Sequence, residues 1–133
     1  MLLTRRFRFA ASHRLHTSAL SDQENRRLYG KCNNPHGHGH DYVLDVTVEG
    51  APDASGQIVD RLKLEELVQS RVVKELDHKN LNLDRAEFQD NVPTTENLAS
   101  VIHRLLDSAW DLPAKLKTIR ISETGRNAFT LDL

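Results

Sequence analysis

The stretch that decides the fold is Cys32-Asn33-Asn34-Pro35-His36-Gly37-His38-Gly39-His40-Asp41-Tyr42, which holds three of the seven histidines and the one cysteine. Behind it the residues alternate: His40, Tyr42 and the aliphatic residues up to Val48 fall on one side, and polar residues fall on the other. Side chains two apart on a strand point the same way. We therefore expect a strand over residues 40–50, with His38 and His40 continuing its apolar face.

Two imidazoles on a buried face need partners, because burying a polar group without one is costly, and a metal ion is a natural partner. Strand residues two apart lie ~7 Å from each other and residues four apart ~13 Å, whereas a zinc–nitrogen bond is only ~2.1 Å long. His38 and His40 can therefore share one ion. His36 and His40 cannot, unless the glycines fold the chain back, so a third ligand must come from elsewhere.

His13 is the candidate for that third ligand. It ends the segment Phe7–His13, in which Phe7, Phe9 and Ala11 share its face. If the two strands pair antiparallel, His13 arrives beside His38 and His40, and three neutral imidazoles leave a position open for water or substrate, as in catalytic zinc sites. Taken alone, His13 is read more readily as a surface histidine at a strand end.

Composition narrows the class of protein. The 133 residues suit one domain, residues 1–133, and a hydrophobic content of 38% with 28% charged residues is typical of a soluble globular chain. A net charge of −1 gives no electrostatic reason to expect nucleic-acid or membrane binding. One cysteine excludes internal disulfides and favours a reducing compartment. Without a signal-peptide pattern at the start, we expect a cytoplasmic protein.

The periodicity predicts an α+β fold. Strands are expected at residues 2–15, 40–50, 116–123 and 128–133, and long helices run from Asp60 to about Leu76 and from Pro93 to about Trp110. A capping box at Ser21 and Glu24 predicts a short helix that Gly30 ends, and residues 81–92 have no clear pattern. We expect a four-stranded antiparallel sheet with two helices on one face. Exposed edges of so short a sheet favour pairing between subunits.

Other polar residues occupy places where chemistry is plausible. Cys32 lies in a polar loop, although a lone cysteine is usually a small buried apolar residue. Asp77 and His78 follow a helix, where they could simply form a polar C-terminus. Glu123 ends an apolar row, and a carboxylate there is expected to meet a cation or a pair of donors.

Four motifs together resemble the 6-pyruvoyltetrahydropterin synthase family, which includes the 6-carboxytetrahydropterin synthases of the queuosine pathway. They are Phe9–Leu15, Cys32–Tyr42, Leu76–Asp84 and Pro93–Asn97. The resemblance covers nearly the whole chain in order. It implies the tunnelling fold and a homohexamer built from two trimers.

The same resemblance implies the roles of the site residues. The zinc ligands would be His13, His38 and His40. Cys32, Asp77 and His78 would be catalytic, with the Asp–His pair reaching the cysteine across a subunit interface. The pterin ring would be bound by Glu123, together with Thr94, Thr95 and Glu96. For the threonines and Glu96, helix capping is a reading that can hold at the same time.

The resemblance also implies a reaction. The substrate would be 7,8-dihydroneopterin triphosphate, and the product 6-pyruvoyltetrahydropterin after loss of triphosphate, with magnesium accompanying the phosphates. The alternatives are the 6-carboxy enzyme, which releases acetaldehyde as well, and a non-catalytic zinc- or pterin-binding module. The Cys-Asn-Asn-Pro loop favours the pyruvoyl enzyme. His36 and Asp41 stand where asparagine is common. Arg8, Arg14 and Lys31 are candidates to contact the triphosphate because they lie close to the metal strands, although each can equally be a solvated surface charge.

Overall fold

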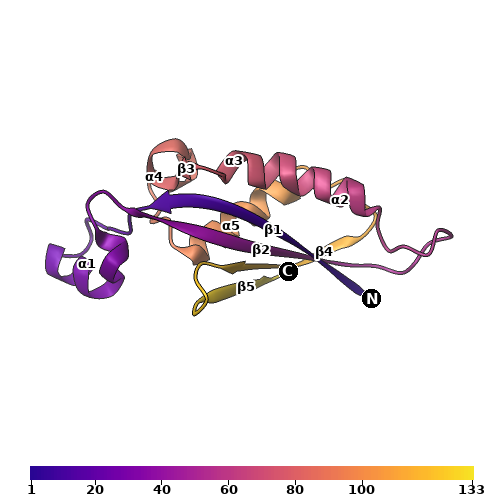
Figure 1. Cartoon of the computed structure of the whole chain (residues 1–133), viewed down its shortest axis with the longest axis horizontal. Coiled ribbons are helices and arrows are strands. Elements are labelled where there is room, and N and C mark those ends of the chain that lie inside the picture. The colour runs from indigo at the N-terminus through magenta and orange to yellow at the C-terminus, as the bar shows by residue number, and fades with distance from the viewer.

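The computed structural model describes residues 1–133 and is built on one five-stranded sheet in the order β3-β1-β2-β4-β5 (Figure 1). The strands are β1 (Leu2–His13), β2 (His38–Glu49), β3 (Lys79–Asn80), β4 (Lys115–Ser122) and β5 (Ala128–Asp132). β1 and β2 pair antiparallel along their whole length, and β4 and β5 continue the antiparallel order. The predicted pairing of the first two strands is thus confirmed.

The prediction of a four-stranded antiparallel sheet is wrong in two respects: the sheet has five strands, and it is mixed. β3 lies parallel to β1, with Ala11 opposite Lys79 and Ser12 opposite Asn80. A two-residue strand is too short to show a period in the sequence. Tertiary contacts place it instead, because the His78 amide donates to the Ala10 carbonyl at 2.6 Å and the Ala10 amide donates to the Asp77 carboxylate at 2.9 Å.

The helices are α1 (Asp22–Tyr29), α2 (Arg61–Val68), α3 (Lys74–Leu76), α4 (Leu81–Asp84) and α5 (Thr95–Asp107). A π-helical turn, Gln69–Val73, joins α2 to α3, so the helix predicted from Asp60 to Leu76 is continuous but widened in the middle. Residues 81–92 contain α4 and a 3₁₀ turn, Ala86–Phe88. The long helices cover one face of the sheet and bury a single core of 24 residues between them.

The opposite face of the sheet is polar. Arg6 donates two hydrogen bonds to Asp45 across β1 and β2, at 2.8 and 3.0 Å, and the hydroxyls of Thr4 and Thr47 lie 2.7 Å apart. The hydrogen bonds from Arg6 hold the pKa of Asp45 below its usual value. A strand with one apolar and one polar face therefore fixes the register, since a slip of one residue would expose the core.

Between β1 and β2 the chain makes a polar excursion that contains α1 and a 3₁₀ turn, Gly30–Asn33. In Figure 1 it extends beyond the end of the sheet where β1 stops and β2 begins. Ser21 caps α1 by accepting from the Glu24 amide, and Gly30 ends it, as predicted. None of the helices has the length and apolar character that a membrane crossing requires.

Candidate metal centre and active site

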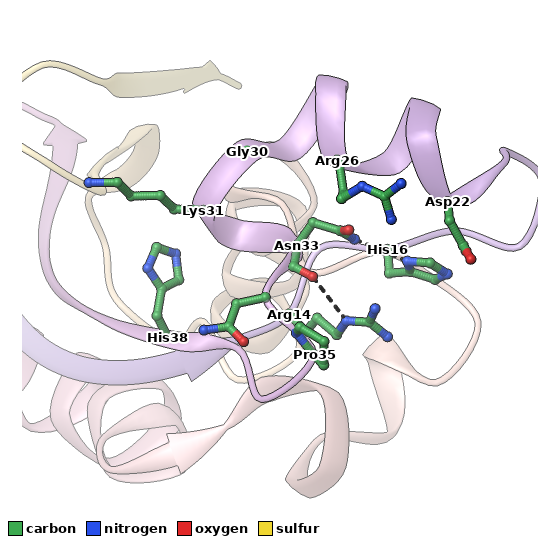
Figure 2. Close-up of a pocket in the computed structure, with 10 residues that line it drawn as sticks. Arg14, His16, Asp22, Arg26, Gly30, Lys31, Asn33, Pro35 and His38 are labelled. Carbon is green, nitrogen blue, oxygen red and sulfur yellow. Dashed lines mark hydrogen bonds between the residues drawn. The ribbon is translucent and has the colours of Figure 1, made fainter.

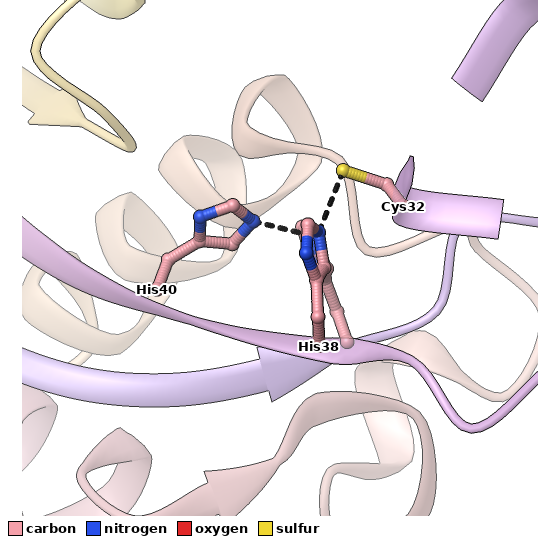
Figure 3. Close-up of side chains that lie close together, drawn as sticks. Cys32, His38 and His40 are labelled. Carbon is pink, nitrogen blue, oxygen red and sulfur yellow. Dashed lines mark hydrogen bonds between the residues drawn. The ribbon is translucent and has the colours of Figure 1, made fainter. Parts of the chain in front are cut away.

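Three histidines meet where β1 ends and β2 begins. The strand register sets His13 directly opposite His38, and His40 follows two residues later on the same face. The Nε2 atoms of His13 and His40 lie 3.1 Å apart, and His38 Nε2 lies 2.9 Å from Cys32 Sγ (Figure 3). The candidate ligand atoms of these four side chains are all within 4.8 Å of one another.

The orientation of His13 is fixed by its other ring nitrogen. His13 is fully buried, and its Nδ1 lies 3.0 Å from the Pro93 carbonyl and 3.4 Å from the Tyr42 hydroxyl. A carbonyl only accepts, so Nδ1 must carry the proton and donate it. The lone pair of Nε2 then faces the other histidines, which is how metal-binding histidines are usually held by a carbonyl behind them.

This donor set fits a metal ion. Two nitrogens bound to one tetrahedral zinc at ~2.1 Å would lie ~3.4 Å apart, and the Nε2 atoms of His13 and His40 already lie at 3.1 Å. Burial lowers the pKa of His13 to about 4 and also lowers the pKa of His40, so both rings are neutral at pH 7. Neutral imidazole is the form that binds metals. His36 is exposed and does not belong to the cluster.

Gly37 makes the approach of β2 to β1 possible. Its φ is +69°, and a Cβ on this residue would lie 2.5 Å from the backbone oxygen of His13. Any other residue would therefore push the two strand ends apart or strain the backbone. The glycine of the motif thus acts on the spacing between His13 and His38 without touching either ring.

Cys32 comes to the cluster from the 3₁₀ turn that ends the excursion. Its side chain is partly buried, and burial raises the pKa of the thiol, with a further increase from the negative charge of Glu123. The protein without a metal therefore favours the neutral thiol. A cation close to the sulfur would act in the opposite direction and favour the thiolate.

Glu123 also points into this cluster. It follows β4 directly, and its Oε1 lies 3.1 Å from His40 Nε2 and 3.6 Å from His13 Nε2. Its side chain is 13% exposed. The nearby donor expected for this carboxylate is therefore a histidine of the cluster. Glu123 and a metal ion would compete for the same nitrogen of His40.

The three residues at the start of α5 lie in different environments. Thr94 caps the helix by accepting from the Asn97 amide, and Glu96 is exposed in the first turn. Thr95 is 2% exposed, and its hydroxyl is a buried polar atom that has no hydrogen-bond partner. A buried hydroxyl without a partner is rare and points to a ligand or a water that completes it.

The Asp77–His78 pair is separate from the cluster. His78 Nδ1 lies 2.9 Å from the Asp77 carboxylate, but the His78 side chain is 84% exposed. His78 has φ of +60°, the only positive φ outside glycine, so its backbone is held in an uncommon conformation. The hydrogen bond from the Ala10 amide is the largest cause of the lowered pKa of Asp77. The pair is thus fixed to β1 and turned outward.

The sequence did not reveal two contributors to the cluster. The Pro93 carbonyl that orients His13 is a backbone atom eighty residues away, and no pattern of residue types marks it. Tyr42 shares a face with His40 in the sequence, but its contact with His13 depends on the pairing of the strands. The alternation of residues along the strand predicted that Tyr42 and His40 share a face, but it could not predict the contact between Tyr42 and His13.

The fold and the site define a small α+β protein with one mixed sheet and a histidine–thiol cluster suited to a metal ion. A family model described as 6-pyruvoyl tetrahydropterin synthase matches residues 2–132, and the chain belongs to that family. The 6-pyruvoyl tetrahydrobiopterin synthase of Poecilia reticulata is 47% identical over 127 residues, which cover 94% of this chain and 85% of the relative.

Two further relatives agree. The 6-pyruvoyl tetrahydrobiopterin synthase of Homo sapiens is 43% identical over 126 residues, covering 94% of this chain and 86% of the human protein. The solved structure of Caenorhabditis elegans 6-pyruvoyl tetrahydropterin synthase has a TM-score of 0.92 and 40% identity. That match covers 100% of this chain and 95% of the other, so the mixed sheet and its helices follow the family fold.

Proposed function

We propose that the protein is a zinc-dependent lyase that converts 7,8-dihydroneopterin triphosphate to 6-pyruvoyltetrahydropterin with loss of triphosphate. One observation carries the proposal: three imidazoles, the Cys32 thiol and the Glu123 carboxylate meet at one end of the sheet. The names of the relatives support the same reaction.

We assign His13, His38 and His40 as the ligands of the zinc. When bound, the ion would polarise the side-chain oxygens of the substrate and acidify the neighbouring C–H bonds. The neutral rings and the hydrogen bond from His13 Nδ1 to the Pro93 carbonyl support this assignment. His36 is left out because it is exposed and apart from the other three.

Cys32 is the residue we assign to proton exchange with the substrate side chain. Asp77 orients His78, and the imidazole passes the proton onward. Within one chain His78 points into solvent, while Cys32 is partly buried beside His38. We therefore propose that the pair serves the cysteine of a neighbouring subunit. This supports a homo-oligomer, which we propose to be a hexamer of two trimers.

The pterin ring is assigned to Glu123 and to the start of α5. A pterin presents adjacent N–H and NH₂ donors, which a carboxylate accepts as a bidentate pair. The Thr95 hydroxyl, buried and without a partner, supports a polar ligand at this place. Thr94 and Glu96 would border the same pocket, and Thr94 caps α5 in addition.

Three wider assignments complete the proposal. Residues 1–133 form one domain, which the single core of 24 residues supports. The protein works in the cytoplasm, which the lone free cysteine supports. Magnesium accompanies the substrate triphosphate, as it does with phosphates in general.

Incubation with 7,8-dihydroneopterin triphosphate and zinc tests the reaction. The expected products are triphosphate and 6-pyruvoyltetrahydropterin in equal amounts, without acetaldehyde. Release of acetaldehyde would instead assign the chain to the 6-carboxytetrahydropterin branch and to queuosine synthesis. Binding of the pterin with no release of triphosphate would make it a binding module and overturn the proposal.

A further inference from the structure

A pocket of about 560 Å³ opens beside the histidine cluster, between the end of β1 and the excursion that contains α1. Ten residues line it and none is hydrophobic; they include Arg14, His16, Arg26, Lys31 and His38 (Figure 2). We propose that this basic pocket binds the triphosphate of the substrate, an inference that rests on the proposed function. Arg26 and His16 become phosphate-binding residues that the sequence had not suggested.

The charges of the basic pocket suit a polyphosphate. Arg14, Arg26 and Lys31 supply three cations, and Asp22 is the only carboxylate in the lining. Arg26 and Lys31 make no side-chain hydrogen bond or ion pair within the chain, whereas the neighbouring Arg27 is paired with Glu24 at 2.8 Å. Cations that are left without a carboxylate around one pocket are available for charge-assisted bonds to phosphate.

The walls of the basic pocket are already ordered. The side chain of Asn33 donates to the Leu15 carbonyl at 2.7 Å and lies 3.0 Å from His16 Nδ1. Arg14 has its backbone amide and carbonyl held by the Asn82 side chain, at 2.7 and 2.9 Å, and its Nε donates to the Asn33 carbonyl at 3.4 Å. The two terminal nitrogens of this guanidinium remain available. An ordered wall lowers the entropy that a ligand must lose on binding.

The candidate ring site, the histidine cluster and the basic pocket follow one another as neighbours. Glu123 lies beside His40, His40 beside His13, and His38 beside Cys32, and His38 also lines the basic pocket. A ring held at Glu123 would therefore place its side chain over the histidines and its phosphates in the pocket. Figure 2 shows Lys31 on the His38 side of the pocket, with His16 and Asp22 on the far side.

The structure distinguishes among the three cations that the sequence offered for the triphosphate, which are Arg8, Arg14 and Lys31. Arg14 and Lys31 line the basic pocket, and Arg8 does not. Arg8 lies on the polar face of the sheet, where its charge acts on Asp45. Asp22 would repel phosphate by itself, so its place at the far end favours a phosphate chain that begins near His38.

Binding of inorganic tripolyphosphate, measured by calorimetry on the zinc-loaded protein at low salt, tests the pocket. Arg26→Ala should weaken binding by about 10-fold or more, because one charge-assisted contact is lost. Arg27→Ala is the matched control, being the next residue on the same helix but outside the lining, and should change the affinity by less than about twofold. Asp22→Asn should strengthen binding, since it removes a repulsion.

The outcomes separate the two proposals. If Arg26→Ala and Arg27→Ala change the affinity for tripolyphosphate equally, and circular dichroism shows that both variants are folded, the assignment of the pocket to phosphate is overturned. This holds even if the enzyme turns over its substrate. An Arg26-dependent affinity for tripolyphosphate without any turnover would keep the pocket and overturn the reaction. As a further arm, dihydroneopterin without phosphates should bind equally to the native protein and to Arg26→Ala. A loss there would mean that Arg26 acts on the ring or the fold, which also overturns the assignment.

Discussion

The histidine cluster and the Asp77–His78 pair are both attached to β1. The cluster is enclosed by the protein and is called the closed region here, whereas the pair faces solvent and is called the open region. His13 is fully buried, with partners from β2, from Pro93 and from Glu123. The His78 side chain is 84% exposed, and it pairs with the Asp77 carboxylate next to it in the chain. The chain therefore assembles its candidate metal site by itself, whereas the candidate proton relay faces outward.

This difference indicates what each region needs in order to work. A cluster in which burial favours the neutral rings of His13 and His40 is ready for an ion as soon as the chain folds. An outward histidine held at φ of +60° carries a backbone cost, which suggests a role outside its own chain. A substitution in the histidine cluster should therefore abolish the metal site of the subunit that carries it. A substitution in the Asp77–His78 pair should leave that metal site intact and should abolish proton transfer to Cys32 of the neighbouring subunit.

The largest effect is expected when a ligand of the closed region is removed. His13→Ala should abolish turnover and reduce zinc affinity by more than about 100-fold. Changing a residue that only supports a metal ligand costs up to about 100-fold in affinity, so removing the ligand itself should cost more. His36→Ala is the control and should leave zinc bound. Metal content after dialysis against a weak chelator measures both. A site emptied by His36→Ala and full in His13→Ala would show that the ligand set is wrong.

Cys32 tests whether the closed region holds a fourth ligand. The sulfur lies 2.9 Å from His38 Nε2 and within the reach of a shared ion. We expect Cys32→Ala to keep its zinc and its pterin affinity and to lose turnover by about 10²- to 10⁴-fold, the usual range for a proton-transfer group. Loss of zinc together with turnover would instead identify the thiol as a ligand.

Mixing two inactive variants tests the open region directly. Cys32→Ala and His78→Ala should each be inactive, but if a site uses Cys32 of one subunit and His78 of another, random assembly of equal amounts leaves about a quarter of the sites intact. Activity should return after the mixture is dissociated and reassembled. No recovery, although mixed oligomers form by mass, would place both residues within one subunit.

The sequence predicted the closed region well because strand geometry is local. Alternation placed His38 and His40 on one face, and antiparallel pairing brought His13 to them. The π-helical turn and β3 were not predicted, because five and two residues respectively carry too little pattern. Contacts in three dimensions decide both.

The chemistry of the site was harder to predict for a related reason. The contact of Glu123 with His40 joins β4 to β2, and the basic pocket joins the end of β1 to α1. Neither depends on spacing along the chain. Residue types suggested that Glu123 needed a donor, but only the pairing of the strands identified which one.

A substitution of Glu123, which belongs to the closed region, is expected to have an intermediate effect on ligand binding. In Glu123→Gln one oxygen becomes an NH₂ group that faces the donors of the pterin. Losing a charge-assisted bond of roughly 1.5–3 kcal/mol should weaken pterin affinity by about one to two powers of ten. Zinc content should not fall. Binding of a simple pterin without phosphates isolates the ring, and an unchanged affinity in a folded variant would refute the assignment.

Asp77 gives the smallest expected effect and shows how firmly the open region is fixed. Its carboxylate accepts from the Ala10 amide at 2.9 Å and holds His78 at 2.9 Å, and these contacts lower its pKa below the usual 3.8. Asp77→Asn can still accept from the amide. The variant should therefore lose less than about 1 kcal/mol of unfolding free energy at pH 7, because solvent screens a partly exposed charge.

The pH dependence of that small loss identifies its origin. A carboxylate with a lowered pKa in the folded state stabilises the protein above its unfolded value, and the contribution disappears as the pH falls through the folded value. The difference between native protein and Asp77→Asn should therefore be constant from pH 7 down to about 5 and should shrink below 3.8. Urea unfolding of both proteins at several pH values measures it. A difference that stays the same at pH 3 would mean that the Asp77 charge does not fix the pair to β1.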